Sequence, residues 1–480
     1  MAVRTRHRHR HQDDGGRDDG GRAAPREHRH PVTAREGDGA RTTSDAASSV
    51  HARRVAVIGT GPVGLITALA LAHHGACVDL IGPPFDAPHA ARDTRTTAIF
   101  LPGIRMLERL GVWAHAAAHA EPLRTMRLID ATGRLLRAPE AAFHSSEIGE
   151  PAFGYNIANT ALIAAAWQAF ADANVTHTPM VKATAVRRVS QTEARRPDVG
   201  QDGASAHQDD VIIAGIDQAG RAITLPALNL VVGADGRHSL VRSSAGISAD
   251  TTPYPQTAIA CSFTHTAPHE GVSTEFHRSD GPLTTVPLPG RRSSLVWVEA
   301  PERAQALMGL DDDAFARTLE AQTDRLLGTV EALTPRAAFP LIKLTAARYA
   351  TANHALVGEA AHVFPPIGAQ GLNLGLRDAA ALAAHVGEGL QRGHGAGAAA
   401  TMDGYDRGRH GDVRLRTLGV DALNRSLLSR ALPAQLLRGA GLHVLNALTP
   451  LRERVMREGM GESRGESRGG IDLPPLMRAD

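Results

Sequence analysis

The amino-acid sequence predicts an α/β fold, in which a domain of alternating strands and helices contains an inserted β-rich region and is followed by C-terminal helices. Three observations lead to this prediction. Residues 55–58 form a short β-branched run that leads through glycines into a helical pattern. Apolar runs of the same kind, each ending in a turn, recur at 230–233 and 355–357. Short alternating segments, clearest at 257–263 and 294–298, predict a sheet between those two runs.

Length and composition exclude several classes of protein. The chain has 480 residues, 42% of them hydrophobic, which suits two or three globular domains. Lys and Arg number 52 and Asp and Glu number 50, so the formal net charge of +2 does not favour a nucleic-acid-binding protein. The two cysteines, Cys77 and Cys261, are far apart in the sequence, which excludes a disulfide scaffold and a thiolate zinc site. No apolar stretch approaches the roughly 18 residues of a membrane span, so we expect a cytoplasmic protein.

Three polar segments are expected to lie outside the folded core. Residues 1–52 are dominated by Arg, His, Asp and Gly and lack the apolar centre of a signal peptide, so they are predicted to be a disordered tail. Residues 191–210 are predicted to be a polar surface insertion, and 461–480 a C-terminal tail. No spacing of His or Cys predicts a metal site.

The first motif is a dinucleotide-binding fingerprint in a strand–turn–helix setting, which predicts a Rossmann-like domain. After the strand at 55–58, Gly59 is expected to make the tight turn, Gly61 to let a pyrophosphate approach the backbone, and Gly64 to allow close helix–strand packing. The free amides at the start of the following helix favour a diphosphate. The carboxylate that binds ribose in this motif is missing, because Gly82 stands at the end of the second strand.

Two later segments identify the family. They are LVVGADGRHSLVR at 230–242 and ALVGEAAHVFPPIGAQGLNLGLRDA at 355–379. With the N-terminal fingerprint they resemble the group A flavoprotein monooxygenases, which have the p-hydroxybenzoate-hydroxylase fold. The block DTRTTAI at 93–99 and the ending NALTPLRERVM at 446–456 resemble the ubiquinone-biosynthesis hydroxylase branch. The resemblance covers about 53–460.

This resemblance implies that FAD is the cofactor. By residue type, Glu359 can accept hydrogen bonds from ribityl hydroxyls, and the Pro- and Gly-rich turn at 365–371 can lie edge-on to a flat ring. The helix that follows would place its positive end near the negative charge of reduced flavin. The resemblance adds Asp235 near the pyrophosphate and Arg95 near the adenosine or pyrophosphate. The full set of expected cofactor-binding residues is Gly59, Gly61, Gly64, Arg95, Asp235, Gly236, Glu359, Pro366, Gly368, Gly371, Leu372 and Asn373.

Three positions depart from the family pattern. Glu359 stands where an Asp is usual, Thr160 stands where an Arg often touches the flavin nucleotide, and Gly82 replaces the ribose carboxylate. None of the three removes the loop expected beside the flavin ring. No catalytic base emerges from the sequence, and His362 is assigned a structural role.

The predicted domain organisation follows from the fold that the resemblance implies. A Rossmann-like FAD-binding domain is expected in three segments, interleaved with a β-sheet substrate domain and followed by C-terminal helices. The FAD-binding segments are 53–123, 151–254 and 346–400, the substrate domain comprises a hairpin at 124–150 and a main part at 255–345, and the helices span 401–460.

The predicted function is FAD-dependent hydroxylation of an aromatic ring with NAD(P)H and O2. The only other segment that resembles the fingerprint, GHGAG at 393–397, follows a helix rather than a strand, so NAD(P)H is expected to bind transiently without a second dinucleotide domain. The expected substrate is a polyprenylated phenol of ubiquinone biosynthesis, and the Leu- and Arg-rich segment 418–456 could contact a membrane surface or a partner protein. Three alternatives stay open: a hydroxylase of another phenol, a flavin dehydrogenase or reductase that does not activate O2, and a non-enzymatic FAD-stabilised subunit.

Overall fold

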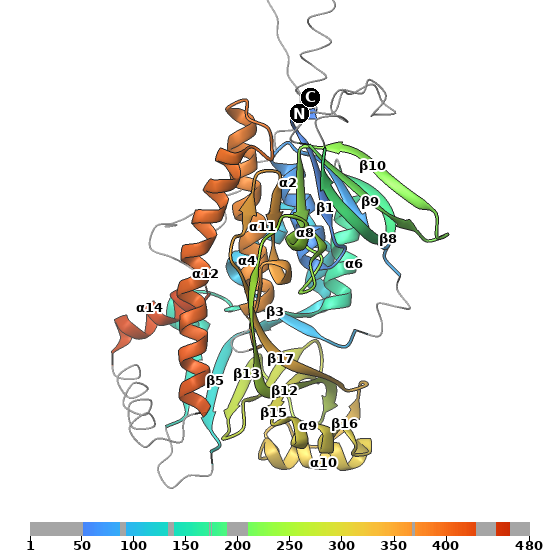
Figure 1. Cartoon of the computed structure of the whole chain (residues 1–480). Coiled ribbons are helices and arrows are strands. Elements are labelled where there is room, and N and C mark those ends of the chain that lie inside the picture. The colour runs from blue at the N-terminus through green and yellow to red at the C-terminus, as the bar shows by residue number, and fades with distance from the viewer. Residues whose placement is uncertain are drawn as a thin grey trace, which may run out of the picture. The chain divides into compact units, whose positions relative to one another are not determined.

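The computed structural model describes residues 51–86, 93–132, 139–171, 173, 175–189, 210–366, 370–428 and 448–460. All the elements below belong to one compact unit, drawn in Figure 1. Residues 1–50 of the predicted N-terminal tail, 191–209 of the predicted insertion, the predicted tail at 461–480 and Gly368 lie outside the described residues. The predicted division into FAD-binding and substrate domains stays a prediction.

An eight-stranded sheet carries the first glycine motif, as the sequence predicted. Its central strands are parallel, and their apolar residues are buried on both faces, which is the pattern of a sheet with helices on both sides. Its order is β10-β9-β8-β2-β1-β11-β19-β18. The strands are β1 (Arg54–Ile58), β2 (Cys77–Gly82), β8 (Val175–Arg188), β9 (Val211–Asp217), β10 (Ala222–Leu228), β11 (Leu230–Gly233), β18 (Ala350–Thr351) and β19 (His354–Leu356).

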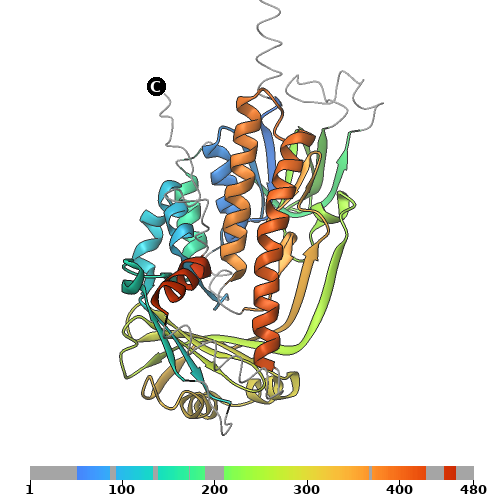
Figure 2. The ribbon, with the colours of Figure 1, turned by 90° about the vertical axis from the view of Figure 1, so that its left-hand side faces the viewer.

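Helices pack on this sheet and on one another. Helix α11 (Gln370–Gln391) lies against α2 (Pro62–His73), which also contacts α6 (Asn159–Phe170). The long helix α12 (Ala399–Leu428) runs beside α11, and both are seen in orange in Figure 2. The short α8 (Leu240–Ser244) is capped by the Ser239 hydroxyl, which accepts a hydrogen bond from the backbone N–H of Arg242 at 3.0 Å.

A nine-stranded, mostly antiparallel sheet forms the inserted region. Its order is β20-β17-β12-β15-β14-β13-β5-β6, with β16 paired to β12. The strands are β5 (Thr125–Asp130), β6 (Ala141–His144), β12 (Ala249–His265), β13 (Val272–His277), β14 (Leu283–Leu288), β15 (Arg292–Glu299), β16 (Val330–Leu333), β17 (Ala337–Ala346) and β20 (His362–Val363). The predicted strands at 257–263 and 294–298 lie in β12 and β15, so both are confirmed.

Two helices, α9 (Pro301–Met308) and α10 (Asp312–Gln322), cover one face of the nine-stranded sheet (Figure 1). Phe276 and Trp297 of the sheet are buried with Phe315 of α10, as expected for core aromatics. The sequence predicts a helix over 311–327 that is capped by the aspartates at its start. Asp311 does cap α10, by accepting the backbone N–H of Ala314 at 2.7 Å. The helix ends at Gln322 and not at Leu327, because the residues at 324 and 325 adopt positive φ angles of 48° and 53°.

A three-stranded sheet, β3-β7-β4, connects the two larger sheets. Its strands are β3 (Thr96–Phe100), β4 (Ala120–Leu123) and β7 (Gly154–Ala158). The hydroxyl of Thr96 donates to the hydroxyl of Ser294 on β15 at 2.8 Å, which ties β3 to the nine-stranded sheet. The described residues also form the α-helices α4 (Leu101–Arg109), α5 (Val112–Ala116) and α14 (Thr449–Met460) and three short 3-10 helices, η1 (Ala117–His119), η2 (Ser145–Ile148) and η3 (Gly358–Ala360).

One contact corrects two predicted boundaries. His51 was assigned to the N-terminal tail and Asp210 to the surface insertion, but both side chains are buried. Nε2 of His51 lies 2.9 Å from Oδ1 of Asp210, a pairing across 159 residues. The folded part therefore includes His51, and the insertion ends before Asp210. Local polarity could not reveal this, because the burial depends on a distant partner.

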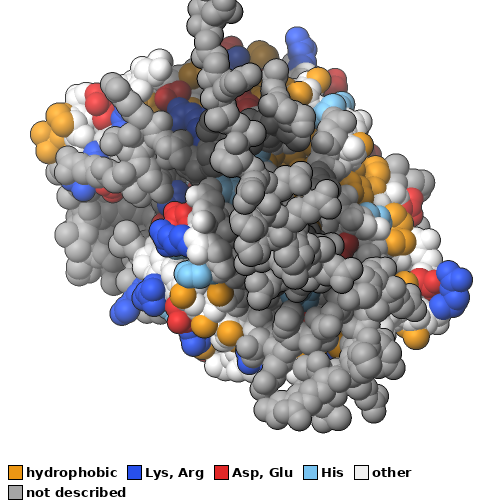
Figure 3. Space-filling model, turned by 90° about the horizontal axis from the view of Figure 1, so that it is seen from above, with side chains coloured by type: hydrophobic (Ala, Val, Ile, Leu, Met, Phe, Trp, Pro, Cys, Tyr) orange, Lys and Arg blue, Asp and Glu red, His pale blue; other side chains and the backbone are white. Residues whose placement is uncertain are grey.

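The described residues contain no helix long and apolar enough to cross a membrane, and no group of three or more His, Cys, Asp or Glu that could hold a metal ion. On the face seen in Figure 3, the basic and acidic side chains of the described residues are interspersed.

Candidate functional site

The first glycine of the fingerprint lies where only glycine fits. Gly59 follows β1 and has a φ of +122°, and its N–H donates to the carbonyl of Ile81 at 2.8 Å. A Cβ on Gly59 would lie 2.2 Å from the carbonyl oxygen of Ala234. A Cβ on Gly64 would lie 1.9 Å from the carbonyl oxygen of Gly59. The backbone of the protein therefore leaves no room for a side chain at either position, whether or not a ligand is bound.

Gly61 is different, because a Cβ there would meet no atom within 4 Å. It is the N-cap of α2, which begins at Pro62, and no side chain caps the helix amides. An open space in front of an uncapped helix N-terminus suits a diphosphate. This is the geometry that the sequence motif predicted.

The place of the missing ribose carboxylate is occupied from within the protein. A Cβ on Gly82 would lie 2.7 Å from Cγ2 of Thr60, so Thr60 fills the space that a side chain would need. The carbonyl of Gly82 lies 3.1 Å from Nε2 of His177 on β8. Thr160, the second departure from the family pattern, is half-buried in the first turn of α6.

Asp235 lies beside the glycine turn. Its Oδ2 accepts the backbone N–H groups of Leu240 and Val241 at 2.7 and 3.3 Å, which fixes the carboxylate at the start of α8. Its Oδ1 is buried and has no hydrogen-bond partner in the described part of the chain. The next residue, Gly236, has a φ of +79° and open space around it. A buried acceptor without a partner next to an open glycine turn suits a polar ligand.

Arg95 and Glu359 belong to the same electrostatic environment. The Arg95 guanidinium donates to both carboxylate oxygens of Asp93 at 2.7 Å and lies 5.7 Å from the centre of the Phe339 ring. The hydrogen bonds that Arg95 donates to Asp93 raise the pKa of Arg95, and the charge of Glu359 adds to this effect. Glu359 is itself exposed, so its carboxylate is accessible to a ligand.

The predicted flavin loop is described at both of its ends. Pro366 is exposed, and a Cβ on Gly371 would meet nothing within 4 Å. Leu372 and Asn373 lie in the first turn of α11. The Asn373 side chain faces β3, since its Oδ1 accepts the N–H of Phe100 at 2.9 Å and its Nδ2 donates to the carbonyl of Ala98 at 2.8 Å. The Asn373 side chain therefore ties the start of α11 to β3.

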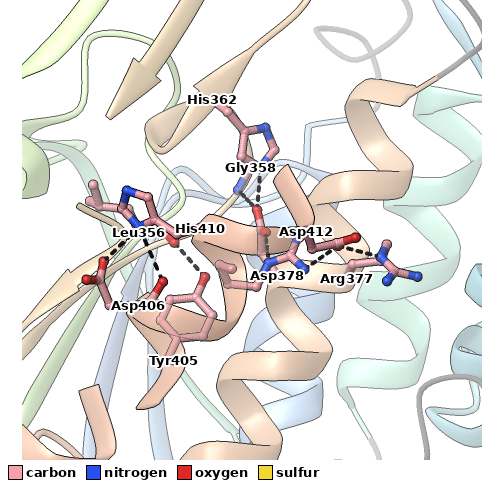
Figure 4. Close-up of polar contacts among 10 residues, drawn as sticks. Leu356, Gly358, His362, Arg377, Asp378, Tyr405, Asp406, His410 and Asp412 are labelled. Atoms are coloured by element: carbon pink, nitrogen blue, oxygen red, sulfur yellow. Dashed lines mark hydrogen bonds and ion pairs between the residues drawn. The ribbon is translucent and has the colours of Figure 1, made fainter. Parts of the chain in front are cut away.

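A buried carboxylate that the sequence analysis did not single out organises this region. Oδ2 of Asp378 on α11 accepts the N–H of Gly358 at 2.9 Å and the Nε2–H of His362 at 2.7 Å (Figure 4). Its Oδ1 accepts Nε–H of Arg409 at 2.7 Å. Asp378 thus holds Gly358 and His362, which lie on either side of Glu359 in the sequence, and this buried contact suits a structural role for His362.

The hydrogen bonds around Asp378 also connect the segment that contains Glu359 to α12. Arg409 also donates from Nη1 to Oδ2 of Asp412 at 2.6 Å, and Asp412 accepts Nε–H of Arg377 at 2.9 Å. The network thus contains two carboxylates and two guanidiniums. Burial alone would raise the pKa of Asp378, but His362 and Arg409 outweigh it and hold the pKa below its usual value. The Tyr405 hydroxyl adds a further link by donating to the carbonyl of Leu356 at 2.8 Å.

These features together fit FAD. The open Gly61 turn and helix N-terminus suit the pyrophosphate, Asp235 supplies a buried acceptor beside that turn, and Glu359 is an accessible carboxylate for the ribityl chain. The adenosine ribose finds no carboxylate at Gly82. The cofactor-binding residues named here are therefore proposals that rest on this geometry.

The comparisons with known proteins decide the family. The family model for the FAD binding domain matches residues 52–415. The chain belongs to this family. Ubiquinone hydroxylase UbiL from Rhodospirillum rubrum is 33% identical over 426 residues, covering 88% of this chain and 92% of the relative. The 3-demethoxyubiquinol 3-hydroxylase of Escherichia coli is 28% identical over 412 residues, covering 85% and 98%.

Solved structures agree on the fold of this FAD-binding family member. The p-nitrophenol 4-monooxygenase PnpA from Pseudomonas putida superimposes with a TM-score of 0.67 at 19% identity, covering 86% of this chain and 99% of that structure. The solved structure confirms the predicted fold class. The family model and the relatives confirm the predicted enzyme class and cofactor, an FAD-dependent monooxygenase of the ubiquinone-hydroxylase branch. NAD(P)H, the predicted reductant, is the usual one for this family.

Proposed function

We propose that this enzyme hydroxylates the aromatic ring of a polyprenylated phenol in ubiquinone biosynthesis. The names of the relatives UbiL and 3-demethoxyubiquinol 3-hydroxylase support a ubiquinone precursor as substrate. The structural observation that carries the proposal is a row of side chains across the nine-stranded sheet. This central row comprises Ala337, Ala260, Val296, Thr284, Glu275 and Leu128, which strand pairing places side by side.

Every member of the central row is half-buried, whereas Trp297 and Phe276 on the other face are buried under the helices. The row is therefore accessible although it lies in the middle of a sheet. Its small and apolar side chains leave a broad, mostly apolar surface, which suits a ring with a long hydrocarbon substituent.

The accessible face is the one directed toward β3 and the cofactor residues. Ser294, two residues before Val296, contacts Thr96 on β3. Phe339, two residues beyond Ala337, lies beside Arg95. Since alternate residues of a strand share a face, the central row faces the same side as these contacts.

The chemistry divides between cofactor and protein. When bound, FAD takes reducing equivalents from NAD(P)H and activates O2 for transfer to an electron-rich ring. The protein must hold the ring in register with the cofactor and keep water away. We assign the positioning to the central row and the cofactor geometry to the Asp378 network.

A matched pair of variants tests the assignment of the row. Ala337→Trp would project an indole into the row, while Ala338→Trp would place the same side chain on the other face, where Ala338 is exposed. We expect Ala337→Trp to lower kcat/KM for a prenylated phenol by about 100-fold, because misplaced substrate loses its reactive geometry. FAD content is expected to stay unchanged in both. Equal activity of the two variants would show that the row is not the substrate surface.

We also propose that α14 contacts the lipid surface in which such a substrate is dissolved. Leu451 and Val455 are 39% and 41% exposed, and their spacing of four residues places them on one face of α14. Leu448, 51% exposed, immediately precedes the helix. The other face is held in the protein, where Met456 packs in a cluster with Phe153. The helix is thus fixed with an apolar stripe outward, which is the arrangement of an interfacial helix.

Sedimentation with anionic phospholipid vesicles tests this contact. Replacing Leu451 and Val455 together by Asp is expected to lower the fraction of bound enzyme by about tenfold, because the apolar contact is lost and charge repulsion is added. Turnover of a short-chain substrate in solution should be unaffected. Vesicle binding that persists in the double variant would contradict the assignment.

A further inference from the structure

We propose that Glu275 accepts a hydrogen bond from a ring hydroxyl of the aromatic substrate and that His277 positions the Glu275 carboxylate for this contact. The inference rests on the proposed function and names the polar group that would orient the ring. Glu275 and His277 lie two residues apart on β13, so both side chains project from the same face. Nε2 of His277 lies 2.8 Å from Oε1 of Glu275.

The pair lies on the accessible face. Phe276 between them is buried in the core under the helices, so Glu275 and His277 point the opposite way, toward the side of the central row. Glu275 is itself a member of that row, between Thr284 on β14 and Leu128 on β5. It is the charged residue of a row otherwise built from alanines, Val296, Leu128 and one threonine.

The exposure of the two residues assigns their roles. His277 is buried, with 8% of the residue exposed, whereas Glu275 is half-buried and accessible. Glu275 is therefore the residue that a ligand would contact, and the buried His277 orients the Glu275 carboxylate. Asp130, which pairs with His277 in register, is engaged by the backbone N–H and hydroxyl of Thr132 at 3.1 and 2.6 Å.

Chemistry favours a hydroxyl donor as the group recognised. The Glu275 carboxylate uses Oε1 for His277, and Oε2 has no partner in the part of the chain that the structure describes. A carboxylate on an apolar surface is costly unless its remaining acceptor sites are satisfied, and a phenolic O–H supplies the missing donor. Drawing the hydroxyl proton toward the carboxylate also increases the electron density of the ring, which assists attack by electrophilic oxygen.

The test compares two probes with the holoenzyme. One is a phenol with a single isoprene unit ortho to the hydroxyl, and the other is its methyl ether, which cannot donate. Binding is measured by the change in the visible absorption of the bound flavin. We expect the wild-type enzyme to bind the phenol about tenfold more tightly than the ether, since a hydrogen bond to a charged acceptor is strong. Glu275→Leu is expected to reduce this ratio, the dissociation constant of the ether divided by that of the phenol, to about 2 or less.

Three further variants complete the design. Glu275→Gln keeps an acceptor for His277, so it preserves the fold and is expected to lower the ratio only partly. His277→Leu leaves the carboxylate in place but without its donor, and an intermediate ratio is expected. Thr285→Val, on the neighbouring strand but on the opposite face of the sheet, is the matched control and should leave the ratio unchanged.

The outcomes separate this inference from the proposed function. A ratio that stays near the wild-type value in both Glu275→Leu and Glu275→Gln, in an enzyme that still hydroxylates the phenol, would overturn the role of Glu275 alone. A wild-type enzyme that neither binds nor hydroxylates the phenol would overturn both. An equal loss of binding for phenol and ether in the Glu275 variants would reduce the pair to a structural role.

Discussion

Replacing Asp378 by Asn is expected to lower the free energy of unfolding by about 3–5 kcal/mol, because it leaves the Arg409 guanidinium buried without its counter-charge. Asp378 is fully buried, and the Arg409 side chain is 5% exposed. The variant also weakens the hold on Gly358 and His362, so bound FAD should be released faster. Urea denaturation followed by far-UV circular dichroism measures the first effect, and flavin fluorescence measures the second.

Asp403→Asn is the matched control. Asp403 also pairs with an arginine, Arg348, at 2.9 Å, but both side chains are about half exposed. Its loss should change the free energy of unfolding by less than about 1 kcal/mol, since water screens such pairs. Equal destabilisation by the two variants would contradict a special role for the buried network.

The pH dependence of the Asp378 effect has a defined sign. Because its pKa in the folded protein lies below the ordinary value of about 4, the charged carboxylate stabilises the fold fully above that value. This contribution disappears as the pH falls through the depressed folded-state pKa. The difference between wild type and Asp378→Asn should therefore shrink as the pH falls below about 4.

Gly61→Val is expected to give a folded protein that holds no FAD. A Cβ at Gly61 meets no protein atom within 4 Å, and its backbone is extended, with φ of −74°, so the protein can accommodate a side chain. The valine would instead occupy the space in front of α2 that we assign to the pyrophosphate. Flavin absorbance after purification and far-UV circular dichroism measure the two properties separately.

Gly64→Val provides the contrast, because its Cβ would overlap the carbonyl of Gly59 at 1.9 Å. We expect this variant to lose both fold and FAD. A Gly61→Val protein that is fully loaded with flavin would show that the pyrophosphate lies elsewhere.

The parts of the fold that could be predicted from the sequence are those specified by neighbouring residues. The apolar strand at 55–58, the glycines after it and the cap at Asp311 each depend on a few consecutive positions. The cofactor could be predicted because the spacing of glycines such as Gly59 and Gly64 indicates a specific backbone conformation.

The parts that could not be predicted depend on contacts between distant residues. Arg409 lies on α12 and pairs with Asp378 on α11. The helix that contains Arg409 has several arginines, and its sequence does not indicate which of them is buried. The one available signal was that Asp378 follows the glycine-rich loop by a few residues on the inner face of a helix. The central row depends on the register of six strands, since a shift of one residue would turn every side chain to the other face.

The most direct test of the account is turnover of a prenylated phenol with NAD(P)H and isotopically labelled O2, followed by mass spectrometry of the product. We predict one labelled oxygen atom in the hydroxylated ring and no product without O2. Product without label, formed under strict anaerobiosis with an artificial electron acceptor, would contradict the monooxygenase account and establish a dehydrogenase.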